Sequence, residues 1–331
     1  MTLAILAASS APLPAGTAAA AGTRSFPHLS CVAGVASASP SPALLRASGY
    51  TPSASGGLRN GPVGVLVERH ARALLASLPG QPPPVHDVLH CQATLLDQIL
   101  ESVCLRIAHG CASQPRRALT IDQTGTTGVG TALLLGSHAS VASADGLVMV
   151  TAADAWSSAF PGDFAPLVTY ASHVGALILR QTDAGRRGKS EHAHVLSVAC
   201  RPASTRSPFW STAPHNVREG IFERLLAAAE EVLANVGWRG AELDILLGDP
   251  IGQDMGSDLA GSLGVPLPNA PQASGPHAGS AALIGNIERA LAFARTRQRP
   301  LKCLLWTASA EGSTAAVALY AFPVSRTLLP D

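Results

Sequence analysis

The feature of this sequence that most constrains its fold is an order of strand-like and helix-like segments that occurs twice. In the first part, strands are expected at 86–94, 117–122 and 146–155, and helices at 63–78, 95–110 and 128–143. In the second part, helices are expected at 217–238 and within 274–297, and strands at 242–250 and, as a pair, within 301–322. Such alternation is typical of layered α/β proteins. We therefore predict two similar α/β halves, residues 1–182 and 183–331.

Two boundary regions of this pattern lead to more specific expectations. The runs 171–181 and 191–200 are expected to be neighbouring strands, joined by a polar bridge. The first residues, MTLAILAASSAPLPAG, lack the basic start of a signal peptide, and their apolar run is short and interrupted. A buried first strand is the favoured interpretation. Residues 1–60 are rich in Ala, Ser, Pro and Gly, so the sequence leaves open whether they are ordered throughout.

Composition agrees with this fold class and argues against several classes of partner. Of the 331 residues 47% are hydrophobic, which is enough for a substantial core. The net charge is +1 and no basic block stands out, so a nucleic acid partner is not expected. No apolar run approaches the ~20 residues of a membrane span. The six cysteines are scattered, without CxxC or zinc-site spacing, which favours free thiols in a reducing cytoplasm and no metal site.

The stretch IDQTGTTGVGTALLLG, residues 121–136, is the clearest candidate for a site. Threonines and glycines here separate a strand-like run from a helix-like run. A helix N-terminus presents unpaired backbone N–H groups, which can hold an anion or a nucleophile. Thr126 or Thr127 could act as the nucleophile if a base removed its proton. Either threonine could instead be an ordinary helix N-cap, and both interpretations stay open.

Several segments resemble the thiolase superfamily, and within it the β-ketoacyl-acyl carrier protein synthase III branch. The similar segments, in chain order, are TIDQTGTTGVGTALLLGSHASVA, YASHVGALIL, LDILLGDPIGQD, GPHAGSAALIGNIERAL and the closing LLWTASAEGSTAAVAL. The likeness spans roughly residues 63–325 and rests on the order and spacing of these motifs. It implies a five-layered αβαβα fold and a dimer with the active site near its interface.

The resemblance also identifies three site positions, and none carries the usual residue. Thr126 stands at the usual cysteine, Asp249 or Gly248 at the usual histidine, and His277 at the usual asparagine. A decarboxylative condensing enzyme of this branch needs the His and Asn pair, so ordinary chain-initiating fatty-acid synthesis is not expected.

Members of the branch that act as acyltransferases or starter-unit enzymes in natural-product pathways are more similar to this sequence. They place a histidine where the asparagine would be, as His277 does here. Their acidic residue follows one helical turn later, where this chain has alanines. Asp249 and Asp254 are the available carboxylates that could orient His277. Turn formation explains Asp249 equally well, and His277 could simply line its own turn.

We therefore predict a ketosynthase III-like acyltransferase of fatty-acid or polyketide-type secondary metabolism. It would move an acyl group from a coenzyme A or acyl-carrier-protein thioester, with no permanently bound cofactor, using Thr126, His277 and Asp249. The alternative is a catalytically silent, ketosynthase-like partner subunit in a heterodimeric condensing enzyme. The basic run GRRGKSEH, residues 185–192, is either a solvated loop or a docking patch for the acidic surface of a carrier protein or for the phosphates of coenzyme A. The acyl chain, the acceptor and the choice between homodimer and heterodimer stay open.

Overall fold

The computed structural model describes residues 2–13, 63–94, 102–111, 115–122, 124–137, 146–156, 162–182, 191–203 and 212–324. The sequence-based expectations for residues 14–60 and for 185–190 of the basic run lie outside these described residues.

Nine strands form the main sheet, and each lies close to a segment where the sequence favours one. They are β1 Thr2–Pro12, β2 Val85–Cys91, β3 Arg117–Ile121, β4 Leu147–Asp154, β7 His173–Thr182, β8 Ala193–Arg201, β9 Ile245–Leu247, β10 Leu301–Ala308 and β11 Thr314–Ala321. The predicted buried first strand is confirmed as β1, whose first residues are all buried. Two short strands, β5 Asp163–Phe164 and β6 Val168–Thr169, form a separate ribbon.

Within the described ranges, six α-helices cover the sheet. They are α3 Val63–Ala76, α4 Val103–Cys111, α5 Gly128–Ser137, α6 Pro214–Val236, α7 Met255–Leu263 and α8 Ala282–Arg297. Short 3₁₀ turns lead into two of them, η2 Gly125–Thr127 before α5 and η6 Gly279–Ala281 before α8. One expected boundary is wrong, because α4 runs through Gly110 to Cys111 instead of stopping at the glycine. In the described part of the chain, no helix has the length and apolar character needed to cross a membrane.

The strand order in the main sheet is mirrored about its centre. It reads β3-β2-β4-β7-β1-β8-β11-β10-β9, so β1, β7, β4 and β2 correspond to β8, β11, β10 and β9. The pairing directions match as well. The pairs β2–β4 and β9–β10 are parallel, whereas β4–β7 and β10–β11 are antiparallel, as are β1–β7 and β8–β11. This mirrored order is what two similar α/β halves require. The boundary at residue 182 stays a prediction.

One expected strand pairing is wrong. The runs 171–181 and 191–200 do form strands, β7 and β8, but β1 lies between them. The strand β1 pairs antiparallel with β7 from Thr2 to Pro12, and its residues Leu3, Ala4 and Ile5 also pair with β8. The reason is that the first residues of this strand are buried, so the backbone groups on both of its edges need partners inside a sheet.

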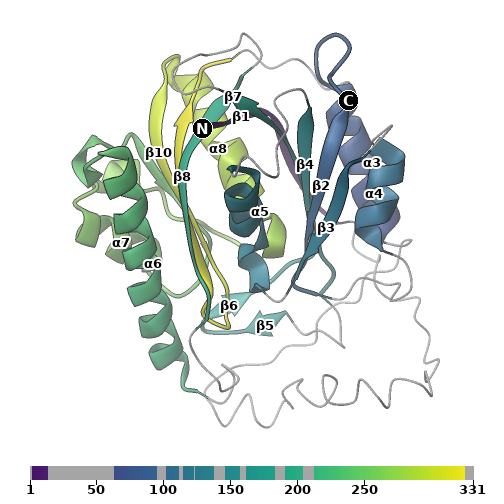
Figure 1. Ribbon diagram of the computed structural model, residues 1–331. Coiled ribbons are helices and arrows are strands. Elements are labelled where there is room, and N and C mark those ends of the chain that lie inside the picture. Colours follow the sequence, from purple (N-terminus) through teal and green to yellow (C-terminus); the bar gives the residue numbers. More distant parts are fainter. Residues whose placement is uncertain are drawn as a thin grey trace, which may run out of the picture.

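The elements stack in five layers (Figure 1). The central helices α5 and α8 lie between the two halves of the sheet and share one apolar core with them. The helices α3 and α4 cover the outer face of the first half, and α6 and α7 cover the outer face of the second half. The predicted αβαβα arrangement is therefore confirmed.

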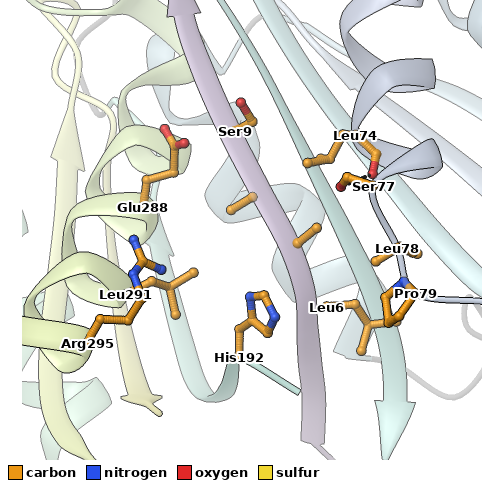
Figure 2. Close-up of a pocket in the computed structure, with 12 residues that line it drawn as sticks. Leu6, Ser9, Leu74, Ser77, Leu78, Pro79, His192, Glu288, Leu291 and Arg295 are labelled. Carbon is orange, nitrogen blue, oxygen red and sulfur yellow. Dashed lines mark hydrogen bonds between the residues drawn. The ribbon is translucent and has the colours of Figure 1, made fainter. Parts of the chain in front are cut away.

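A pocket of about 120 Å³ lies beside β1 (Figure 2), and its lining includes no residue of η2, which carries Thr126 and Thr127 and is called the threonine turn below. Leu74 and Pro79 line it from α3 and the segment after that helix, whereas Glu288 and Arg295 line it from α8. Its lining includes none of the three residues predicted for the site.

A small residue lets the central helix α5 lie close to the second half of the sheet. A Cβ atom added at Gly130 would lie 2.6 Å from the Cβ of Ala315 on β11 and 3.2 Å from the Sγ of Cys200 on β8. Real Cβ atoms do not approach that closely, so the spacing between α5 and β11 depends on this glycine.

We expect Gly130→Leu to lower the free energy of unfolding by at least ~2 kcal/mol, because overpacking forces the helix away from the sheet. Chemical denaturation followed by circular dichroism measures this. The control is Gly261→Ala on α7, where an added Cβ meets open space and where alanine favours the helix by ~0.5–1 kcal/mol. Equal stability of Gly130→Leu and the wild type would contradict the close packing.

Candidate functional site

The threonine turn lies between β3 and α5, at the centre of the molecule. Thr126 is 1% exposed, and its hydroxyl donates a hydrogen bond of 3.1 Å to the carbonyl oxygen of Ala308 at the end of β10. The Thr127 hydroxyl donates to the carbonyl oxygen of Thr124 at 2.7 Å. A side-chain N-cap accepts a backbone N–H, whereas these two bonds are donations to carbonyls. The bonds therefore give no support to the N-cap interpretation.

His277 is fully buried, and both nitrogens of its ring are engaged. The backbone N–H of Gly279 donates to Nδ1 at 3.0 Å, so we assign the proton of the neutral ring to Nε2. Nε2 lies 3.0 Å from the carbonyl oxygen of Ala308 and 3.1 Å from Oδ2 of Asp249. A single Nε2–H cannot serve both acceptors fully. Its alignment with the carbonyl leaves Oδ2 of Asp249 close by but without a hydrogen bond.

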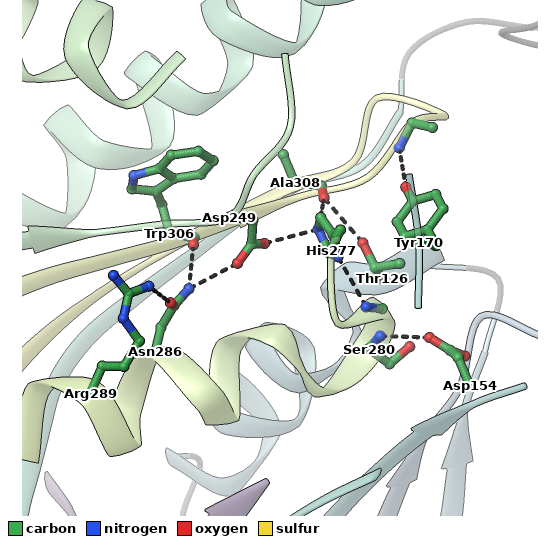
Figure 3. A network of polar contacts seen from close by, with 12 residues as sticks. Thr126, Asp154, Tyr170, Asp249, His277, Ser280, Asn286, Arg289, Trp306 and Ala308 are labelled. Atoms are coloured by element: carbon green, nitrogen blue, oxygen red, sulfur yellow. Dashed lines mark hydrogen bonds and ion pairs between the residues drawn. The ribbon is translucent and has the colours of Figure 1, made fainter. Parts of the chain in front are cut away.

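Asp249 follows β9 and is held from its other side by α8 (Figure 3). The Asn286 side chain donates to Oδ1 of Asp249 at 2.8 Å and lies 3.3 Å from the carbonyl oxygen of Trp306. The Arg289 guanidinium in turn donates to Oδ1 of Asn286 at 3.1 Å. A polar chain therefore leads from Arg289 through Asn286 and Asp249 to His277.

Thr126 and His277 are brought together around one carbonyl oxygen and not by direct contact, and Asp249 joins them through His277. The Ala308 oxygen receives the hydroxyl of Thr126 and faces Nε2 of His277. Of the two carboxylates considered for orienting His277, Asp249 is the one beside it. Asp254 is exposed at the start of α7. The sequence did not reveal that a backbone carbonyl lies at the centre of the site.

The backbone of His277 is clamped by the short ribbon. Its backbone N–H donates a hydrogen bond of 2.7 Å to the carbonyl oxygen of Thr169. Its carbonyl oxygen accepts a hydrogen bond of 2.8 Å from the backbone N–H of Ala171. The ring of Tyr170 packs edge to face against the imidazole of His277, with the ring centroids 4.9 Å apart. It also stacks on the ring of Trp156, with the centroids 4.4 Å apart. These contacts fix the direction in which the imidazole points.

A buried carboxylate anchors the turn that follows His277. Asp154, at the end of β4, accepts backbone N–H bonds from Ala93 at 2.6 Å, Thr94 at 3.1 Å and Ser280 at 2.5 Å. Burial raises the pKa of Asp154, although those N–H donors act in the opposite direction. Gly279 adopts a φ of +57°, and a Cβ there would lie 2.4 Å from Oδ2 of Asp154. The turn before α8 therefore requires a glycine.

A further acidic residue, Glu311, is partly buried and was missed by the sequence analysis. It lies in the hairpin between β10 and β11, and its Oε1 occupies the space where a side chain at Gly125 would begin, 1.5 Å from an added Cβ. Burial raises the pKa of Glu311 to about 7. The available signal was a single charged residue in the small-residue segment ASAEGST.

A buried thiol also lies near the turn. Cys91 ends β2 and is fully buried, with its Cβ 3.1 Å from a Cβ added at Gly128. Burial raises the pKa of this thiol, with the charge of Asp154 adding to the effect. The thiolate is the nucleophilic form of cysteine, so Cys91 is not an activated replacement for the missing nucleophile.

A pocket of about 290 Å³ reaches the polar chain from the side of α8. Asp249, Asn286 and Arg289 contribute to its lining, together with Pro276 and Ala278 on either side of His277. Among the described residues, no group of three or more His, Cys, Asp and Glu side chains could hold a metal ion.

Comparison with known proteins finds similarity in structure only. No family model matches the sequence, and no curated protein matches it. The structure is similar to an acyltransferase, ChlB3, at a TM-score of 0.68 and 14% identity, covering 98% of this chain and 99% of that one.

Two condensing enzymes are also similar. The 3-oxoacyl-(acyl carrier protein) synthase III of Pseudomonas aeruginosa PAO1 has a TM-score of 0.65 and 17% identity, covering 98% of this chain and 100% of that one. The tetronic acid condensing enzyme AbyA1 has a TM-score of 0.66 and 17% identity, covering 97% of this chain and 100% of that one. The chain therefore has the thiolase-like fold of the synthase III branch, as its motifs predicted.

The raised pKa of Glu311 predicts a specific pH dependence of stability. The folded chain holds this proton up to pH about 7, whereas an ordinary glutamate releases it near 4.5. The folded state therefore binds more protons between these values, and stability falls as the pH rises through that window. Relative to Glu311→Gln, the wild type should lose about 3 kcal/mol between pH 4.5 and pH 8.

Denaturation curves of both proteins at each pH measure this difference. The matched control is Glu230→Gln at an exposed position of α6, which should track the wild type at every pH. A constant difference between wild type and Glu311→Gln would mean that Glu311 is ionised normally in the folded protein.

Proposed function

We propose that this chain, with the fold of the synthase III enzymes, transfers an acyl group from a coenzyme A or acyl-carrier-protein thioester to an acceptor in fatty-acid or polyketide-type secondary metabolism. The observation that carries the proposal is the buried Asp249–His277 pair, with Nε2 and Oδ2 3.1 Å apart, close to the N-terminus of the central helix. A buried imidazole and carboxylate in contact form the usual acid–base unit of acyl transfer.

The N-terminus of α5 supplies the second requirement of the reaction. The first backbone N–H groups of a helix lack intrahelical partners and carry partial positive charge. Placed against the oxygen of a thioester carbonyl, they stabilise the oxyanion that forms when the carbonyl carbon is attacked. The helix α5 begins at Gly128, directly after the threonine turn.

The route that fits the hydrogen bonds is direct transfer. His277 takes the acceptor's proton on Nδ1, which breaks the bond from Gly279 N–H, and Asp249 stabilises the imidazolium. The acceptor oxygen or nitrogen attacks the carbonyl carbon, the C–S bond breaks, and the imidazolium returns the proton to the leaving sulfur. Thr126 is not acylated and only lines the site, because its hydroxyl already donates a hydrogen bond to the carbonyl oxygen of Ala308.

One observation favours the alternative of a catalytically silent partner subunit. Thr126 and His277 are 1% and 0% exposed, so the isolated chain shields both from solvent, whereas Asp249 lines the pocket beside α8. A subunit that only completes a ketosynthase-like mate would have no need of an open site.

Intact-protein mass spectrometry and thioester turnover with a panel of acyl-coenzyme A and acyl-carrier-protein substrates test the proposal. We expect turnover without a stable adduct, a loss of at least 10²-fold in His277→Gln, and less than a tenfold loss in Thr126→Ala. Thr127→Ala, which removes the adjacent hydroxyl, is the matched control for Thr126→Ala.

Other outcomes separate the alternatives. A stable adduct that disappears in Thr126→Ala, but not in Thr127→Ala, would replace direct transfer by covalent catalysis. Absence of turnover with every thioester and acceptor, together with co-purification of a ketosynthase-like mate whose activity requires this chain, would establish the silent subunit.

A further inference from the structure

The side chain of Glu311 projects from the β10–β11 hairpin into the threonine turn. Its Oε1 lies against Gly125, the residue directly before Thr126, where only a glycine leaves room for it. The Ser309 hydroxyl enters the same space, 2.3 Å from a Cβ added at Gly125. The carboxyl group therefore lies at the start of η2, which runs directly into α5.

One oxygen of the Glu311 carboxyl group lacks a hydrogen-bond partner. Oε1 of Glu311 is buried and has no hydrogen-bond partner, and the same holds for the hydroxyl of Thr124 at the other side of the turn. Buried polar atoms in folded proteins are nearly always paired, so an unpaired one at a candidate site points to a missing ligand. Both atoms border the place proposed for the thioester.

Burial decides the protonation of Glu311, and the charged groups around it act more weakly. From the neighbouring elements, His277 lowers the pKa of Glu311 and Asp154 raises it, while Tyr170 is coupled to it by charge. On the side of α6, the Arg224 guanidinium donates to the carbonyl oxygen of Gly312 at 2.7 Å. Burial outweighs the groups that lower this pKa, which are the hydrogen bonds from its own backbone and from Ser313 and the charge of His277. The pKa of Glu311 is therefore raised to about 7.

We propose that Glu311 is a further site residue, whose protonated carboxyl donates a hydrogen bond to the carbonyl oxygen of the bound thioester. The inference rests on the proposed acyl-transfer function and adds a donor to the N–H groups of α5. The carboxylic acid keeps its proton throughout, so the balance of the transfer step is unchanged. A carboxylate in the same place would repel the developing oxyanion, so only the neutral acid supports the reaction.

Three proteins test this role, namely the wild type, Glu311→Gln and Glu311→Leu. Glutamine keeps an N–H donor of the same shape but cannot ionise, whereas leucine keeps much of the volume and removes the donor. Circular dichroism and thermal unfolding of each variant verify that it is folded. The exposed Glu230→Gln again serves as the control for a Glu-to-Gln change.

The first readout is kcat/KM for the best acyl-coenzyme A substrate between pH 5.5 and pH 9. Wild-type kcat/KM should fall about tenfold per pH unit above pH ~7, as the acid ionises. Glu311→Gln should stay within tenfold of the wild-type maximum and lose this fall, and Glu311→Leu should lose at least 10²-fold. Equal inactivity of the Gln and Leu variants would mean that the carboxylate acts as a base. Higher activity of Glu311→Leu would mean that Glu311 merely obstructs the site, and either result overturns the proposal.

The second readout needs no catalysis and separates this inference from the proposed function. The probe is a ketone analogue of acetyl-coenzyme A, with a methylene group in place of sulfur. Wild type should bind it about tenfold more weakly at pH 8 than at pH 6, because the donor form is depleted, and Glu311→Gln should bind equally at both. If no thioester is turned over, this binding pattern still establishes the donor. Binding by wild type that does not change with pH would exclude it.

Discussion

The carbonyl oxygen of Ala308 is the point on which the candidate site depends. It ends a buried central strand of the second half, yet it accepts the hydroxyl of Thr126 from the first half and faces the imidazole of His277. A carbonyl oxygen has two lone pairs, so both donors can be satisfied at once. The Ala308 oxygen therefore holds the threonine turn close to the turn that carries His277, without any direct bond between the two turns. It also explains why the hydroxyl and the imidazole lie near each other without forming a nucleophile–base pair.

Local sequence patterns were sufficient for most of the fold, and pairings between distant segments were not. Apolar periodicity located β1, α3, α6 and the β10–β11 hairpin, because burial on one face or two leaves a repeat in the sequence. The same patterns gave no reason to place β1 between β7 and β8. The choice of strand neighbours depends on contacts between segments far apart in the chain. A helix boundary at Gly110 was also misplaced, since packing can override the preference of a single glycine.

The site shows the same division. The order of the motifs pointed to Asp249 and His277, which the structure places 3.1 Å apart. Asn286 was visible only as part of a helix motif, and Glu311 only as a charge in a hairpin of small residues. Their positions follow from how α8 and the hairpin meet the threonine turn, which no local spacing encodes. The resulting interior holds three acidic side chains, Asp154, Asp249 and Glu311, and burial raises the pKa of Asp154 and of Glu311.

The position of β1 at the middle of the sheet has a consequence for folding during synthesis on the ribosome. Thr2 pairs with Thr182 and Pro12 with His173, so β1 cannot pair with β7 until the long segment between these two strands has been synthesised. At roughly 5–20 residues per second, this apolar segment waits on the order of ten seconds or more. Formation of the central sheet is therefore slow by topology, in keeping with the high sequence separation of its contacts. During that interval a chaperone or the ribosome surface has an accessible hydrophobic strand to shield.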